Sequence, residues 1–151
     1  MTTARAASAE QTLPVVVAMH RLLRGLRRAG SSNSIPPTQL IVLALLNQHG
    51  PLRIGELAHR IPCSQPTATT VVAAMNADGY VHRTPDPTDG RAIRVAATDE
   101  GLETLRSIAV GEAEVLANLL AGIPHAEREA FLAAAPIIGK LADRPNAALD
   151  S

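Results

Sequence analysis

The residues best suited to chemistry in this chain of 151 residues lie in one turn-rich segment, Asp86-Pro87-Thr88-Asp89-Gly90-Arg91. An arginine at the tip of a hairpin is a cation on a protruding loop, where it can enter the minor groove of DNA. We expect Asp89 to orient Arg91 through a charge-assisted pair. Arg83 and Arg94, on the flanking strands, would lie beside this loop. The alternative is a surface Asp–Arg pair that only holds the turn.

The helix expected after residue 63 carries a second group of candidate residues. Its outward face is small and uncharged, with Pro66, Thr69, Thr70, Ala73 and Ala77. Thr69 and Thr70 can hydrogen-bond base edges or contact thymine methyl groups, and Gln65 can reach a base or a phosphate. Ser64 and the first free N–H groups of the helix suit a phosphate. The alternative is a surface helix that is merely rich in threonine.

The elements that would position these residues follow one another closely over residues 52–101. A helix that ends at Pro62 is predicted by one apolar face, formed by Ile54, Leu57, Ala58 and Ile61. The next helix begins at Ser64, which is a good N-cap, and ends at Gly79; its apolar face is formed by Ala68, Val71, Val72 and Met75. Two strands are expected over residues 81–84 and 92–97, joined by the turn-rich loop. Helix, turn, helix and hairpin in this order predict a winged helix.

Leu52 and Arg53, which directly precede the first of these helices, have separate expected roles. Leu52 is expected to form a one-residue strand that pairs with the hairpin. Arg53 stands where a Ser or Thr cap would be usual. Its guanidinium cannot accept a hydrogen bond from the helix N–H groups, so the cap is weak. The same side chain could instead hold a phosphate.

Further helices with one apolar face flank the winged helix: residues 15–28, the segment after Pro37, about two dozen residues after Thr98, and residues 125–141. Pro136 predicts a kink or an early end near Ala135. These helices carry more apolar surface than a winged helix can bury. A second copy of the chain would cover it, and two recognition helices on a two-fold axis would read a palindrome.

The expected fold class is therefore mainly α (α+β), a winged helix-turn-helix with N- and C-terminal helices that form a dimerisation region. We expect a disordered N-terminus over residues 1–10, a DNA-binding domain over residues 36–98, and a helical dimerisation region built from residues 11–35 and 99–145.

Composition and charge distribution argue against a membrane protein and place the positive charge in the N-terminal part of the chain. Net charge is zero, but residues 1–35 carry five arginines against one acidic residue, whereas residues 99–151 carry four basic and nine acidic residues. No apolar run approaches the roughly 18 residues of a membrane helix, and no leader segment opens the chain. We expect a cytoplasmic protein that does not contact membranes. With no phosphate loop, nucleophile elbow or close acid pair, we expect neither an enzyme nor a cofactor.

Short motifs between residues 36 and 101 occur together in one order. They are Thr38-Gln39, Leu43, Glu56-Leu57-Ala58, Ser64, Thr67, Thr69, Asp78-Gly79-Tyr80-Val81, Arg83, Asp86-Pro87-Thr88-Asp89-Gly90-Arg91-Ala92 and Thr98-Asp99-Glu100-Gly101. This run resembles the MarR family of bacterial transcription regulators. Its most specific part is Asp89 and Arg91, followed seven residues later by Thr98.

The resemblance implies a homodimeric winged helix, usually a repressor, that binds double-stranded DNA. It gives Arg91 the family's wing role in the minor groove and Asp89 the partner role, and it matches Ser64, Thr67 and Thr69 to recognition-helix positions. It also implies a pocket near the junction of the DNA-binding and dimerisation regions, for a small aromatic or lipophilic anionic effector.

Three residues depart from the family's pattern. Thr70 stands where many members carry Arg, Ala97 replaces the usual Leu before Thr98, and Pro136 interrupts the last helix. The contacts of position 70 with DNA and the packing of the last helix are therefore expected to differ from those of the family.

Two alternatives remain open on the sequence. Cys63, the single cysteine, precedes a helix N-terminus that would stabilise a thiolate, so a redox-sensing regulator is conceivable. A neutral recognition helix also suits a winged helix that binds protein rather than DNA. A metal site is not expected, because Pro62 breaks the helical spacing between His59 and Cys63.

Overall fold

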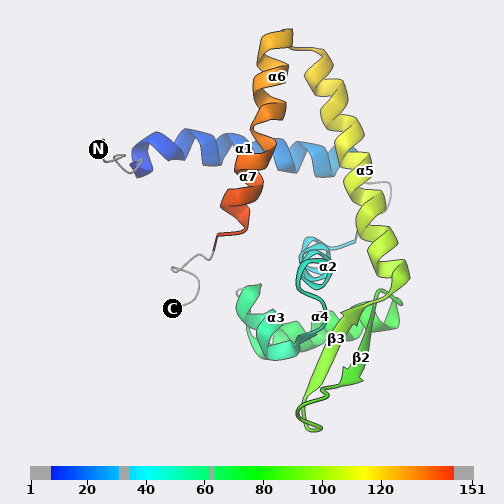
Figure 1. The fold of residues 1–151 in the computed structure, drawn as a ribbon. Helices are drawn as coiled ribbons and strands as arrows, with labels where there is room; N and C mark the ends of the chain where they lie inside the picture. Colours follow the sequence, from blue (N-terminus) through cyan, green and yellow to red (C-terminus); the bar gives the residue numbers. More distant parts are fainter. Residues whose placement is uncertain (1–7, 31–34, 62, 145–151) are drawn as a thin grey trace.

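The structure, a computed structural model, describes residues 8–30, 35–61 and 63–144 (Figure 1). The elements are α1 (Ala9–Gly30), α2 (Pro37–His49), β1 (Leu52–Arg53), α3 (Ile54–Arg60), α4 (Gln65–Ala77), β2 (Val81–Pro85), β3 (Ile93–Ala97), α5 (Asp99–Ala121), α6 (His125–Ala133) and α7 (Ala135–Ala142). This order confirms the predicted mainly α fold with a winged helix-turn-helix.

The sheet of the winged helix has three antiparallel strands in the order β1-β3-β2. Leu52 pairs with Val95 and Arg53 with Arg94. Side chains alternate between the two faces of a strand, so Leu52 and Val95 face the core together while the two arginines share the outer face. The expected one-residue strand is confirmed, with Arg53 as a second residue.

The core lies between this sheet and helices α2, α3 and α4. Its fully buried members are Val42, Leu43, Leu57, Val72, Met75, Val81 and Val95. All are aliphatic, as the scarcity of aromatic residues requires. The helix faces predicted from spacing supply Leu43, Leu57, Val72 and Met75, so the sequence pattern identified the interior of this domain correctly.

A side-chain cap marks the start of helix α4, and a glycine follows its end. The Ser64 hydroxyl oxygen accepts from the Thr67 N–H at 3.2 Å, as expected of an N-cap. Gly79, with φ of +81°, follows the helix in a conformation that L side chains rarely adopt. Helix α3 begins differently. The Arg53 N–H donates to Glu56 Oε2 at 2.7 Å, while the Arg53 guanidinium plays no capping part.

Thr98 joins the wing to the long helix α5. Its hydroxyl donates to the Gly79 carbonyl at 2.6 Å and accepts from the Gly101 N–H at 3.0 Å. The helix then passes so close to the chain before β2 that a Cβ at position 101 would overlap the Tyr80 carbonyl oxygen. Gly101 therefore permits the close approach with which α5 leaves the winged helix.

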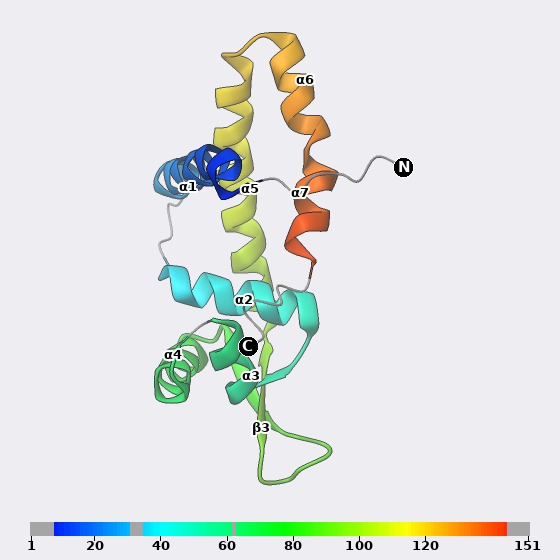
Figure 2. The ribbon, with the colours of Figure 1, turned by 90° about the vertical axis from the view of Figure 1, so that its left-hand side faces the viewer.

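The outer helices form the other half of the molecule. Helices α5, α6 and α7 make a long hairpin, and α1 crosses α5 on the side opposite α7 (Figures 1 and 2). At the crossing, a Cβ on Gly111 would lie 2.6 Å from the Gly30 carbonyl oxygen, so only glycine permits this approach. The predicted interruption near Ala135 is confirmed, because α6 ends at Ala133 and α7 begins at Ala135.

Some expected boundaries were wrong. Helix α1 begins at Ala9 and extends to Gly30, so residues 9 and 10 are helical rather than disordered, and the helix continues beyond its expected end at residue 28. Residues 1–7 of the expected disordered segment and residue 145 of the expected dimerisation region lie outside the described residues, as do residues 31–34 and Pro62. Among the described helices, none is both long enough and apolar enough to cross a membrane.

We predict that Gly101→Ala lowers the free energy of unfolding by about 1–3 kcal/mol, because the added methyl group must displace backbone at Tyr80. Urea denaturation followed by circular dichroism measures this. Gly55→Ala is the matched control, since a Cβ there meets nothing within 4 Å, and it should be neutral or slightly stabilising. Equal effects of the two substitutions would contradict the close approach.

Candidate nucleic-acid interface

Helix α4 presents a small, uncharged face to solvent. Gln65, Thr67, Thr69 and Thr70 are all exposed. The Thr69 hydroxyl donates to the Gln65 carbonyl at 2.9 Å, and the Thr70 hydroxyl donates to the Pro66 carbonyl at 3.0 Å. Because both hydroxyl protons are used within the helix, these threonines can offer acceptor lone pairs and methyl groups to a partner. Such a face suits base amino groups and thymine methyl groups.

In the first turn of α4, some polar side chains form hydrogen bonds with each other and one does not. The hydroxyl oxygens of Ser64 and Thr67 lie 2.8 Å apart, so each holds the other at the start of the helix. Among the described residues the Gln65 amide has no hydrogen-bond partner, which leaves it available to a base or a phosphate. Gln65 is therefore the polar side chain of this turn with the greatest freedom to reach outward.

The tip of the wing differs from the expected arrangement. Asp89 Oδ1 accepts from the backbone N–H of Arg91 at 3.1 Å, and within the described residues no carboxylate lies within ion-pair distance of the Arg91 guanidinium. The predicted side-chain pair between Asp89 and Arg91 is thus wrong, because a carboxylate two residues before a turn amide is better placed to accept from the backbone. Arg91 remains exposed on a loop that protrudes beyond α3 and α4 (Figure 2).

Sequence reasoning missed the residue that organises the wing. Asp86 has a fully buried side chain. Its Oδ1 accepts from the Thr88 N–H at 2.7 Å, the Thr88 hydroxyl at 2.6 Å and the Asp89 N–H at 3.2 Å. These bonds close the loop over a single carboxylate oxygen. The signal was present in the order Asp-Pro-Thr, since aspartate commonly accepts from the backbone two residues on.

The other oxygen of Asp86 binds two arginines. Arg53 and Arg94 each donate through Nε to Asp86 Oδ2 at 2.8 Å. Arg53 also reaches the Thr88 hydroxyl with one terminal nitrogen at 3.4 Å. The structure therefore brings Arg53 and Arg94 together at the base of the wing, which their separation in sequence did not suggest.

These contacts change the acidity of Asp86. Hydrogen bonds from the Arg53 and Arg94 guanidiniums, and then from the Thr88 hydroxyl and backbone N–H, hold the pKa of the Asp86 carboxyl far below its usual range. The Asp86 carboxylate in turn raises the pKa of Arg53. Both shifts favour the charged forms of Asp86 and Arg53.

Arg83 is not part of this cluster. It pairs with Val95 in the β2–β3 ladder, so its side chain leaves the face of the sheet opposite to that of Arg94. Arg83 is exposed and is available to solvent on its own. Arg83 and Arg94 do lie on the two strands that flank the loop, as expected, but their side chains leave opposite faces of the sheet because their positions differ by one residue in register.

No group of three metal-binding side chains occurs within the part of the chain that the structure describes. Cys63 is half-buried just before α4, and its backbone N–H donates to the Ala58 carbonyl at 3.1 Å.

Comparisons with known proteins decide the family. A sequence model of the MarR family matches residues 35–93. The HTH-type transcriptional regulator Mb0904 of Mycobacterium bovis is 33% identical over 127 residues, which are 84% of this chain and 89% of that protein. The chain belongs to the MarR family. It is therefore a helix-turn-helix transcription regulator from a family of regulators, not of enzymes.

Other members of the MarR family extend the likeness. The HTH-type transcriptional repressor MdtR of Bacillus subtilis is 32% identical over 108 residues, which are 72% of this chain and 68% of MdtR. The solved structure of a MarR family protein from Bacillus stearothermophilus has the same fold, with a TM-score of 0.69 at 22% identity, covering 91% of this chain and 100% of that one.

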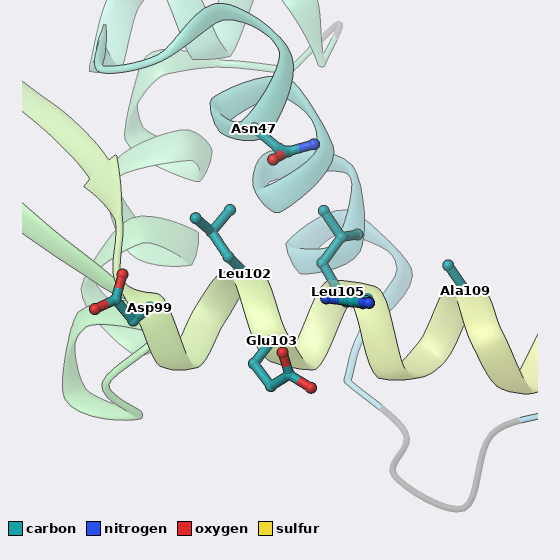
Figure 3. A pocket seen from close by; sticks show the side chains of 7 residues that line it. Asn47, Asp99, Leu102, Glu103, Leu105 and Ala109 are labelled. Atoms are coloured by element: carbon teal, nitrogen blue, oxygen red, sulfur yellow. The ribbon is translucent and has the colours of Figure 1, made fainter.

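A cavity lies where the winged helix of this MarR protein meets α5. It has a volume of about 540 Å³ and is lined by Asn47, Asp99, Leu102, Glu103, Leu105, Arg106 and Ala109. Leu102 and Leu105 reach from α5 toward Asn47 on α2, whereas Glu103 points to the other side of α5 (Figure 3). The cavity thus has an aliphatic floor between two helices that belong to different halves of the molecule.

We predict that Asp86→Asn reduces the acid sensitivity of folding. Because the pKa of Asp86 is lower in the folded protein than its unfolded value of 3.8, the ionised carboxylate stabilises the fold above that pH, and this contribution is lost as the pH falls below it. Urea titrations at intervals from about pH 6 to pH 3 should show a steeper loss of stability in the wild type than in the variant. Parallel curves would contradict the predicted coupling.

Proposed function

We propose that this MarR protein is a ligand-responsive repressor that binds a palindromic operator in double-stranded DNA as a homodimer. Helix α4 lies in the major groove and the wing in the minor groove. The observation that carries the proposal is the combination of an exposed, uncharged threonine face on α4 with an exposed arginine, Arg91, at the tip of a protruding, internally braced wing. The name of MdtR supports repression rather than activation.

Each proposed DNA contact has a distinct role. Thr69 and Thr70 read base edges or methyl groups, and Gln65 reaches a base or a phosphate at the helix start. Ser64 and Thr67 hold the first turn against the DNA backbone. Arg91 enters the minor groove on the turn that Asp89 shapes, and the DNA backbone passes the exposed Arg83. The proposed site of action is the cytoplasm, where a bacterial regulator meets DNA.

Apolar surface on the outer helices supports the homodimer. Side chains that a stable monomer would cover are exposed there: Leu13, Val15, Val16, Val17, Met19 and Leu23 of α1, Phe131 and Leu132 of α6, and Ile137, Ile138 and Leu141 of α7. The exposed fraction reaches 61% at Leu13 and Leu141. An apolar surface of this extent indicates an interface. A second copy of the chain could cover the exposed side chains of α1, α6 and α7 together.

We propose that a small lipophilic effector binds in the cavity between α2 and α5. Leu102 and Leu105 would contact its apolar part, and Arg106 is the one cation in the lining. The aromatic or lipophilic anion expected from the sequence stays a prediction. The negative charges of Asp99 and Glu103 in the lining disfavour an anion. A molecule in this cavity touches both the DNA-binding domain and α5, so its binding would change the separation of the two α4 helices.

We predict that Arg91→Ala weakens specific DNA binding by about 1–3 kcal/mol, because the wing loses its minor-groove cation. The measurement is fluorescence anisotropy on the DNA flanking the protein's own gene, at two salt concentrations, against scrambled DNA. Arg128→Ala is the control. It removes the same charge from α6, at the end of the molecule opposite the wing (Figure 1), and should leave affinity unchanged.

The same titration tests the proposed function itself. Binding to one palindromic segment with two chains per site, weakened by salt, is the expected result. If neither the flanking DNA nor any sequence from a random library binds more tightly than scrambled DNA, the repressor proposal is wrong. The winged helix would then have to recognise a protein.

A further inference from the structure

Arg53 and Arg94 are held in an unfavourable position by the sheet itself. They are directly opposed in the β1–β3 ladder and project from the same face. Directly opposed residues of an antiparallel pair have Cβ atoms about 5 Å apart, and like charges at that distance destabilise the pair. Two neutral or apolar residues at these positions would make the β1–β3 pairing more stable. The stability of the fold alone therefore does not explain the two arginines.

Asp86 offsets this repulsion and still leaves the terminal nitrogens of both arginines available as donors. Both guanidiniums donate only their inner Nε to the same oxygen, Asp86 Oδ2, at 2.8 Å. Among the described residues, the terminal nitrogens of Arg94 have no partner, and those of Arg53 have one long contact to Thr88. The arginine side chains are 41% and 35% exposed, whereas that of Asp86 is fully buried. The cluster keeps one net positive charge and directs its remaining donors outward.

We propose that Asp86, Arg53 and Arg94 form a preorganised clamp for one phosphate of the DNA backbone. Arg53 and Arg94 contact the phosphate oxygens through their terminal nitrogens, and Asp86 is a positioning residue that does not touch DNA. The inference rests on the proposed function and adds to it a site at the base of the wing. Guanidiniums already fixed by a carboxylate lose less side-chain entropy on binding than free ones.

The position of the clamp favours a backbone phosphate over other anions. It lies where the β2–β3 ladder meets the loop that carries Arg91, since Arg94 pairs with Thr84 next to the last pair of the ladder, so a wing that enters the minor groove brings the clamp against a flanking strand. The cluster offers donors alone to a partner, which matches a phosphate and gives no means of reading a base. The clamp therefore fixes register rather than sequence.

The substitution Asp86→Asn distinguishes a positioning role of Asp86 from a purely electrostatic effect, because the two predict opposite changes in DNA affinity. Asp86→Asn removes a negative charge from the DNA-binding domain, so charge alone predicts tighter binding to DNA. If Asp86 positions the arginines, the variant binds about tenfold more weakly despite its added positive charge. Asp78→Asn is the matched control, because it makes the same charge change at the exposed end of α4, and it should bind as tightly as wild type or slightly better.

A second substitution keeps the test decisive if Asp86→Asn does not fold. Arg94→Lys preserves the charge and leaves the Asp86–Arg53 pair intact, but it removes the planar fork that binds two oxygens. The clamp predicts several-fold weaker binding at a salt slope close to that of the wild type, because the lysine keeps the charge that displaces counterions. Circular dichroism and thermal melting confirm that each variant tested is folded.

Three outcomes of these anisotropy titrations are informative. Weaker binding by every folded variant of the pair Asp86→Asn and Arg94→Lys, with Asp78→Asn binding as tightly as wild type or slightly better, supports the clamp. Unchanged or tighter binding by folded Asp86→Asn, or wild-type affinity of folded Arg94→Lys, overturns the clamp and leaves the repressor intact. Failure of the wild type itself to bind any DNA specifically overturns both.

Discussion

The wing depends on one buried carboxylate. Asp86 accepts three hydrogen bonds from its own loop on one oxygen and two from arginines on the other, and its side chain is closed to solvent. Each group alone would be unfavourable, since a buried carboxylate needs partners and two opposed arginines repel each other. Together they satisfy one another, and the loop, β1 and β3 become a single rigid unit.

This unit connects the rest of the fold to its surface chemistry. Arg53 is the residue before α3, so the cluster also fixes where the helix-turn-helix begins. At the other end of the hairpin, Thr98 and Gly101 fasten α5 to the turn that follows α4. The wing, the recognition helix and the long helix are therefore held by short polar contacts, while the aliphatic core supplies the bulk of the stability. A change in the angle of α5 would be transmitted to α4 through this turn.

Patterns of local origin could be predicted from the sequence. The spacing of Leu57, Val72 and Met75 identified the core, Ser64 and Thr98 marked helix starts, and Pro136 marked the break between α6 and α7. Each depends on residues within a few positions of one another. The outward positions of α4 follow from the same helical period, and the exposure of Thr69 and Thr70 agrees with it.

Features that depend on strand register could not be predicted in the same way. The pairing of Arg53 with Arg94 joins residues far apart in sequence, and only the observed register places both beside Asp86. A shift of one residue moves a side chain to the other face, so the sequence could place Arg83 and Arg94 on the two strands beside the loop but not on opposite faces of the sheet. The Asp89–Arg91 pair was expected between side chains, but the geometry of the turn favoured the backbone N–H.

The central claim is that the wing and α4 act on DNA as one rigid reader, repeated by two-fold symmetry. A hydroxyl-radical footprint on an operator selected from random DNA tests this most directly, because the radical reports minor-groove and backbone access at each nucleotide. The account predicts two outer protected segments, one for each wing, placed symmetrically about the segments bound by the two α4 helices. A single asymmetric footprint, or uniform protection along the DNA, would contradict it.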